Sequence, residues 1–106
     1  MPMNELIERV RTGEVVILDT RPAHEFAAGH IAGALSVPVA ELRRRLGKLA
    51  KSKEYVAYCR GRYCSYADRA VELLRANGRR ARRLLDGFPE WQAAGLPVEI
   101  AKGARP

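Results

Sequence analysis

Both cysteines of the chain lie in one segment, residues 56–70, which reads VAYCRGRYCSYADRA. Cys59 and Cys64 are separated by four residues, and arginines and tyrosines surround them. Two cysteines at this spacing could form a redox pair, half of a metal site, a disulfide, or a nucleophile beside an anion-binding loop. The elements on either side of the segment decide between these chemistries.

The residues around the cysteines predict a loop between a strand and a helix. Residues 55–59 form a short apolar run typical of a buried strand, and the loop after them contains Gly61. Ser65 is a predicted N-cap, with Asp68 at the capping-box spacing. A loop that enters a helix N-terminus directs backbone N–H groups inward, so it stabilises a thiolate and binds an oxyanion. Cys59 is therefore the predicted nucleophile, with a pKa below that of a free cysteine.

The whole loop is the predicted site for an anionic substrate, because its guanidinium groups add positive charge beside Cys59. The predicted substrate-binding residues are Arg60, Gly61, Arg62, Tyr63, Cys64 and Ser65. Cys64 has two roles that the sequence leaves open. It either packs under the loop or acts as a resolving thiol that attacks a persulfidated or oxidised Cys59.

The other cysteine chemistries fit the spacing less well. A zinc site needs about four ligands, and Cys59, Cys64, His24 and His30 match no common zinc pattern. A thioredoxin-like pair is C-x-x-C, which is a shorter spacing. Phosphatase and arsenate-reductase loops resemble one another in the spacing C-x5-R, and the sixth residue after Cys59 is Ser65. We therefore expect neither a metal nor a cofactor.

Composition and charge limit the class of protein. The 106 residues suit one globular domain, and no apolar run approaches the roughly 20 residues that cross a bilayer. The first residues lack the apolar stretch of a signal peptide, so we expect a reducing, cytoplasmic setting with free thiols. The net charge of +7 invites a nucleic-acid interpretation, but no aromatics are interleaved with the arginine clusters at residues 43–45 and 79–83, and zinc-finger spacing is absent. We expect a basic surface that attracts small anions, without direct nucleic-acid binding and without a membrane partner.

Apolar runs and helical stripes alternate along the chain. Predicted strands cover residues 15–18, 34–38, 55–59 and 81–85, and predicted helices cover residues 3–10, 22–29, 39–49, 67–76 and 89–94. This order predicts an α/β fold with a mainly parallel central sheet of four to five strands and helices on both faces. Asp19 and Cys59 end two of the strands, so both should lie at the sheet edge where ligands bind. We expect one domain over residues 1–100 and a C-terminal tail over residues 101–106.

Three blocks of the sequence resemble the single-domain rhodaneses, a family of sulfurtransferases. The first block is LDTRPAHEFAAGHIAGALSVP, residues 18–38, and the second is YCRGRYCS, residues 58–65, whose loop has the family's six-residue length. The third is LDGFPEWQAAGLPVE, residues 85–99, in which Gly87 and Phe88 stand where the family usually has two glycines. Together the blocks cover nearly the whole chain, and the resemblance implies the rhodanese fold.

The resemblance also implies a reaction. The Cys59 thiolate would take the outer sulfur of a donor such as thiosulfate, forming a persulfide, and would pass it to cyanide or a thiol acceptor. Cys64 at the last loop position is similar to the rhodanese domains fused behind ArsR-type repressors, which implies a fused or separate transcription-regulator domain as a partner. The alternative function is therefore a sulfur- or redox-sensing or carrier module that uses the pair Cys59–Cys64.

Three further residues are expected to support the loop. Asp19 should accept hydrogen bonds that brace the sheet edge, and Asp86 should close the rim of the site. Arg21 should pair with Glu25, four residues later on the same short helix.

Overall fold

The computed structural model describes residues 3–61, 64–84 and 87–100 of the chain. Residues 101–106, the expected tail, lie outside the described residues. The elements follow one another as α1 (Met3–Arg11), β1 (Val15–Asp19), α2 (Ala23–Ala28), β2 (His30–Ile31), β3 (Leu35–Ser36), α3 (Val39–Arg45), η1 (Leu46–Lys48), β4 (Glu54–Tyr58), α4 (Tyr66–Ala76), β5 (Arg80–Arg83), α5 (Phe88–Ala93) and β6 (Val98–Glu99).

The central sheet has four strands in the order β3-β1-β4-β5, and every pairing in it is parallel. The predicted α/β class with a mainly parallel sheet is therefore confirmed. Strands β1 and β4 are in the middle, which explains their continuous apolar character, since both of their faces are covered. Asp19 pairs with Tyr58 in this register, so β1 and β4 end side by side and Cys59 follows directly.

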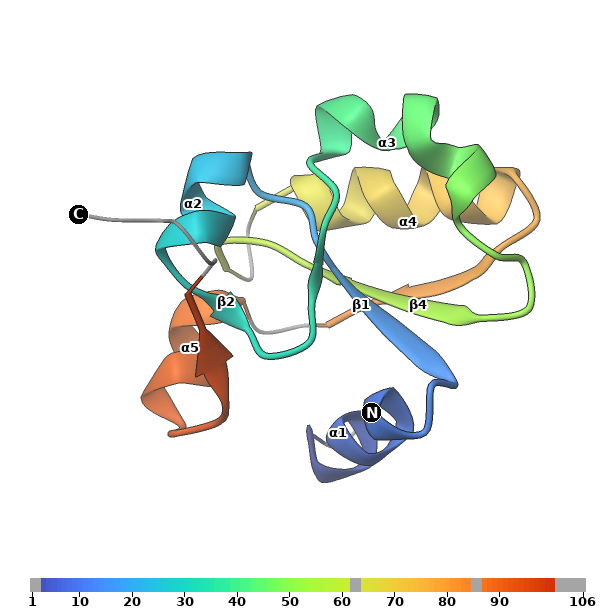
Figure 1. The fold of residues 1–106 in the computed structure, drawn as a ribbon. Helices are drawn as coiled ribbons and strands as arrows, with labels where there is room; N and C mark the ends of the chain where they lie inside the picture. The colour runs from blue at the N-terminus through green and yellow to red at the C-terminus, as the bar shows by residue number, and fades with distance from the viewer. Residues whose placement is uncertain (1–2, 62–63, 85–86, 101–106) are drawn as a thin grey trace.

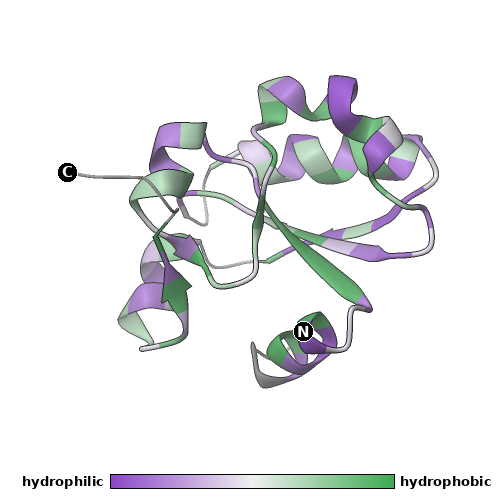
Figure 2. Ribbon diagram, viewed as in Figure 1, coloured by the Kyte–Doolittle hydropathy of each residue, from purple (hydrophilic) through white to green (hydrophobic). Residues whose placement is uncertain are grey.

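Helices cover both faces of this sheet (Figure 1). Helices α3 and α4 lie on one face, over a buried cluster that includes Leu18, Leu42, Ala57 and Leu74. Helices α1 and α5 lie on the other face, over a cluster that includes Leu6, Ile17, Tyr58 and Trp91. Figure 2 shows the same division, with an almost continuously hydrophobic β1 between helices whose hydrophilic and hydrophobic residues alternate. Burial on both sides holds β1 and β4, and therefore their carboxyl ends, in place.

A second, two-stranded sheet was missed by the sequence analysis. Strand β2 pairs antiparallel with β6, and the register joins His30 to Glu99. The Glu99 carboxylate also accepts a hydrogen bond from the Gly33 amide at 2.8 Å. Each strand has only two residues, too few to show an alternating pattern. This small sheet ties the end of the chain's third block to its first block.

The length of the helices decides whether any of them could cross a membrane. Within the described ranges, no helix is both long and apolar enough to cross a membrane.

Candidate active site at Cys59

Cys59 is held at the end of β4 by bonds that fix the peptide before it. The main-chain oxygen of Tyr58 accepts hydrogen bonds from the Thr20 amide at 3.1 Å and from Thr20 Oγ1 at 2.8 Å. The Phe88 amide donates to the Cys59 oxygen at 3.2 Å. Cys59 is only 1% exposed, so its sulfur lies at the floor of the loop that follows.

Asp19 and Arg21 form a buried ion pair beside this strand end. The Arg21 guanidinium donates to both Asp19 oxygens, with an Nη2–Oδ2 distance of 2.7 Å, and also to the Gly29 oxygen at 2.6 Å. The predicted pair between Arg21 and Glu25 is wrong, because Arg21 turns back to Asp19. Asp19 does brace the sheet edge, and within the described ranges it does so through Arg21 and Tyr58 rather than through the cysteine loop.

Tyr58 links this ion pair to the strand that carries Cys59. Its hydroxyl donates to Asp19 Oδ2 at 2.6 Å and accepts from the Ile31 amide at 3.0 Å. Burial, followed by the nearby Asp19 carboxylate, raises the pKa of Tyr58 far above its ordinary value. Tyr58 therefore stays protonated and remains a donor to Asp19 at any physiological pH. Because side chains alternate along a strand, Tyr58 anchors one face while Cys59 faces the other.

The Cys59 sulfur is surrounded by main-chain groups of the loop. Its Sγ lies 3.4 Å from the Cys64 oxygen and 3.7 Å from the Gly61 oxygen, distances at which the thiol donates to carbonyls. The amides of Gly61 and Ala67 also reach the sulfur and favour its ionised form. Acceptors and donors are thus both present around one sulfur atom, and their balance sets its charge.

The structure contradicts the predicted lowering of the Cys59 pKa. Burial, then a hydrogen bond to the Cys64 sulfur, raises the pKa of Cys59 above that of a free cysteine. Burial opposes ionisation of Cys64 too, but the hydrogen bond from Cys59, the Tyr66 and Arg60 amides and the charge of Arg60 lower its pKa overall. Cys59 is therefore the weaker acid of the two thiols and Cys64 the stronger.

Helix α4 begins where predicted, but its cap differs. Ser65 occupies the N-cap position without a side-chain capping bond. Asp68, the expected partner in a capping box, accepts a hydrogen bond from Arg83 instead, at 2.8 Å. The amides of the first turn therefore remain directed at the sulfur atoms, as the contributions of Tyr66 and Ala67 show.

Arg60 lies on the outer side of the loop and is already paired. Its guanidinium binds Glu25 of α2 through three contacts of 2.6–3.1 Å and lies 5.3 Å from the centre of the Tyr66 ring. The side chain remains 52% exposed. Arg60 thus connects the loop to α2 and α4, and much of its charge is neutralised before any substrate arrives.

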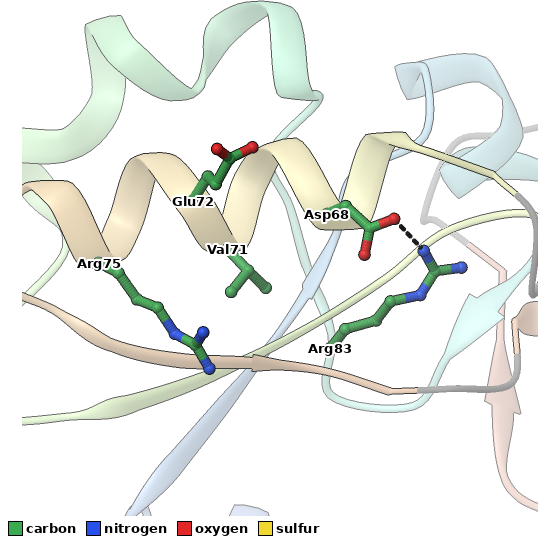
Figure 3. A pocket seen from close by; sticks show the side chains of 5 residues that line it. All are labelled: Asp68, Val71, Glu72, Arg75 and Arg83. Carbon is green, nitrogen blue, oxygen red and sulfur yellow. Dashed lines mark hydrogen bonds and ion pairs between the residues drawn. The ribbon is translucent and has the colours of Figure 1, made fainter.

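Arg83 is a site residue that the sequence analysis missed. Its Nη2 donates to the Gly61 oxygen at 2.6 Å, and its Nη1 donates to the Cys64 oxygen and to Asp68, both at 2.8 Å. Nη2 also lies 4.0 Å from Cys59 Sγ. Figure 3 shows the Asp68–Arg83 pair at one end of a surface pocket of about 480 Å³ between α4 and β5.

The position of Arg83 beside the cysteine loop follows from the register and the alternation of β5. Arg83 pairs with Ala57, and Cys59 stands two residues beyond Ala57 on the same face of the sheet. In the run RARR, Ala81 is buried while Arg80 and Arg82 are exposed, so alternation directs Arg83 to the side of the cysteine loop.

Gly87 touches the loop from the other side. A Cβ atom at position 87 would lie 2.4 Å from the Gly61 nitrogen and 2.6 Å from the Arg60 carbonyl carbon, closer than atoms can approach. The next residue, Phe88, stands where the family usually has glycine, and its ring lies 4.7 Å from the Arg21 guanidinium. The first glycine of the usual pair is therefore required here, whereas the second position accommodates a side chain under Arg21.

Three predicted site residues, Arg62, Tyr63 and Asp86, lie outside the described residues. The described part brings Asp19, Arg21, Cys59, Arg60, Gly61 and Cys64 to one edge of the sheet. In the same described ranges, no three histidine, cysteine or acidic side chains are grouped so as to hold a metal ion. The arrangement consists of two free thiols, inward-facing amides and flanking guanidinium groups.

Comparisons with known proteins bear on this arrangement. Residues 2–94 match the family model described as "Rhodanese-like domain". An HTH-type transcriptional regulator of Mycobacterium tuberculosis is 50% identical over 95 residues, which are 90% of this chain and 42% of that protein. The chain therefore spans less than half the length of that relative.

Two other proteins match over most of their own length. Thiosulfate sulfurtransferase GlpE of Coxiella burnetii is 30% identical over 91 residues, or 84% of this chain and 82% of that protein. The crystal structure of a rhodanese-related protein from Thermoplasma volcanium superposes with a TM-score of 0.79 at 28% identity, covering 92% of this chain and 94% of the other.

Proposed function

Because the chain belongs to the rhodanese-like domain family, we propose that it transfers sulfur from thiosulfate through a persulfide on Cys59. The single observation that carries the proposal is the place of Cys59 at the end of β4. There the sulfur meets the amides of Gly61 and Ala67, and a loop closes over it. The named activity of the Coxiella relative supports thiosulfate as the donor.

The proposed reaction has two steps. In the first, the Cys59 thiolate attacks the outer sulfur of thiosulfate, the S–S bond of the donor breaks, and sulfite leaves with the bonding electron pair. In the second, cyanide or a thiolate attacks the terminal sulfur of the persulfide and releases the Cys59 thiolate. The terminal sulfur of the persulfide is anionic, and inward-facing amides of the loop stabilise charge at that position.

The raised pKa of Cys59 sets the pH dependence of the first step. Burial keeps Cys59 mostly protonated near neutral pH, so the rate of loading should rise as the pH increases through a pKa above that of a free cysteine. Cys64 is the more acidic thiol of the pair, so its thiolate forms before that of Cys59 as the pH rises.

Mass spectrometry of the intact chain tests the proposal. After treatment with thiosulfate and removal of the excess, we expect the mass to increase by one sulfur atom on the peptide that contains Cys59. Cyanide should then release thiocyanate and restore the original mass. Cys59→Ser should abolish both events, and Cys64→Ser should retain single-step loading. Loading of Cys59→Ser at the parent rate would assign the nucleophile to Cys64 and reject the proposal.

A second candidate function is supported by the regulator from Mycobacterium tuberculosis and by the position of the two free cysteines, since Cys59 Sγ lies 3.4 Å from the Cys64 main-chain oxygen. In this candidate, the Cys64 thiolate attacks the inner sulfur of the Cys59 persulfide. A disulfide joins Cys59 to Cys64, and the terminal sulfur leaves as hydrosulfide. Counted from the two free thiols, the cysteine sulfurs together give two electrons to the sulfane sulfur, which takes up a proton as it leaves, so no other reductant is needed.

The two candidates differ in what accumulates. A carrier or sensor should convert to the disulfide and release sulfide after one equivalent of donor, without an external acceptor. An enzyme should hold the persulfide until an acceptor arrives and then turn over repeatedly. Non-reducing peptide mapping together with sulfide measurement separates these outcomes, and Cys64→Ser should prevent the disulfide only.

A further inference from the structure

We propose that Arg83 is the cation that allows Cys59 to ionise, by holding the two loop carbonyls that face the sulfur and by placing its own charge beside it. The proposal rests on Cys59 being the reacting thiol of the proposed function and assigns a role to a residue on β5. The positions that carry it are Gly61, Cys64 and Asp68, all of them bound by the same guanidinium.

Two carbonyl oxygens are shared between Cys59 and Arg83. The oxygens of Gly61 and Cys64 lie 3.7 and 3.4 Å from Cys59 Sγ, and Arg83 donates to the same two oxygens at 2.6 and 2.8 Å. Each oxygen therefore contacts both the sulfur and a guanidinium N–H. No other described side chain donates to both of them.

This sharing matters when Cys59 loses its proton. A protonated thiol can donate to either carbonyl, but a thiolate is repelled by the negative partial charge of both oxygens. The guanidinium bound to both oxygens offsets that charge, and its Nη2 lies 4.0 Å from the sulfur itself. A positive charge within about 4–6 Å of an acidic group favours the ionised form.

Arg83 is better placed for this role than Arg60. The Arg83 side chain is 14% exposed, whereas that of Arg60 is 52% exposed and engages Glu25. Water screens exposed charges strongly, so the largely buried guanidinium of Arg83 acts more effectively on a buried sulfur than the exposed one of Arg60. Asp68 orients Arg83 from the first turn of α4 and is itself 62% exposed, so it neutralises Arg83 only in part.

The chain provides matched variants for a test. Cys64→Ser leaves Cys59 as the single cysteine, so any thiol reaction then reports on Cys59 alone. In this background, Arg83→Met removes the charge and both carbonyl contacts. Arg83→Lys keeps a charge without the two-pronged geometry. Arg82→Met is the control, because the neighbouring Arg82 side chain points to Glu54 at the other end of the sheet.

The readout is the rate of alkylation by iodoacetamide across a range of pH, with circular dichroism and thermal unfolding to establish folding. We expect Arg83→Met to slow alkylation about tenfold at neutral pH and to move the pH profile to higher pH. Arg83→Lys should fall between Arg83→Met and the parent, and Arg82→Met should leave the profile unchanged. If Arg83→Met does not fold, Arg83→Lys must still be alkylated more slowly than both the parent and Arg82→Met.

An unchanged pH profile in a folded Arg83→Met or Arg83→Lys variant would overturn the proposal. Alkylation needs no sulfur donor, so this result is distinct from a failure of the proposed function. Absence of thiosulfate loading in the parent chain would reject the sulfur-transfer reaction, while a shifted alkylation profile would still support the role of Arg83.

Discussion

The two ends of the parallel sheet both carry a buried carboxylate bound by arginine, but only one of them adjoins a thiol. At the amino end, Glu54 begins β4 and binds Arg9 of α1 at 2.7 Å and Arg82 of β5 at 2.9 Å. At the carboxyl end, Asp19 binds Arg21 at 2.7 Å and accepts from the Tyr58 hydroxyl at 2.6 Å. The charged groups are similar, and the surroundings differ.

The two ends of the sheet differ in the groups that lie beside the ion pairs. At the amino end, Glu54 is shared between two arginines, and the pairing joins α1 to the sheet. At the carboxyl end, the ion pair lies on the Tyr58 face of β4, and the opposite face presents Cys59 to a loop. The ion pair at the reactive end is therefore structural, and the alternation of the strand separates it from the reacting sulfur by one residue.

The largest expected effect is that of Asp19→Asn. The substitution leaves Arg21 buried without its counterion, which costs about 3–5 kcal/mol of unfolding free energy. The one amide oxygen that remains cannot serve both Arg21 and the Tyr58 hydroxyl as the two carboxylate oxygens do, so sulfur loading at Cys59 should be lost as well. Urea unfolding and thiosulfate loading measure the two effects. Glu8→Gln, at a 63% exposed ion pair on α1, is the control and should change neither.

The next effect is that of Gly87→Ala at the reactive end. The added methyl group would lie 2.4 Å from the Gly61 nitrogen, so the loop must move. We expect a loss of about 1–3 kcal/mol, typical of overpacking, and at least a tenfold slower loading of Cys59. Gly47→Ala is the matched control, since its Cβ would meet nothing within 4 Å. Normal loading by Gly87→Ala would show that the loop does not depend on this contact.

A smaller effect is expected from Glu54→Gln at the amino end. The amide retains one acceptor but removes the charge that both arginines share, which should cost about 1–2 kcal/mol. Loading of Cys59 should keep its parent rate, because the two arginines bind Glu54 at the far end of β4. This variant tests directly whether the two ends are independent, since a slower reaction would mean that they are coupled.

The smallest expected effect is a loss of folding stability at acidic pH. Burial opposes ionisation of Glu54, but hydrogen bonds and charges from Arg9 and Arg82 outweigh it and lower its pKa. The hydrogen bond from Arg60 likewise lowers the pKa of Glu25, and burial offsets this only in part. A lowered pKa in the folded state contributes stability above the ordinary pKa of about 4.3, and this is lost as the pH falls further. Unfolding of the parent at decreasing pH should show this loss, and Glu54→Gln should show a shallower one.

Much of the site could be predicted from the sequence because it depends on strand ends. The apolar runs before Asp19 and Cys59 placed both residues at one edge of a parallel sheet, and the register of β1 and β4 confirms this. The three blocks that resemble rhodaneses were similarly informative, and the match over residues 2–94 confirms the family. The resemblance to regulator-fused domains agrees with the relative that is 50% identical.

The remaining features depend on contacts that local patterns do not encode. Arg83 reaches Cys59 across 24 positions of sequence, and its run of arginines resembles a solvated surface. The pKa of Cys59 depends on which loop carbonyls face the sulfur, an orientation that composition cannot give. Ser65 had the residue type of a cap, but its side chain forms no capping bond, and Asp68 is drawn instead to Arg83.

The order of the central sheet has one more consequence. Its outer strands are β3, which has only two residues, and β5, which carries Arg80, Arg82 and Arg83 among its four. Short or highly charged edges discourage a strand of another molecule from adding to the sheet. A sheet with such edges resists self-association through the addition of a strand from a second molecule.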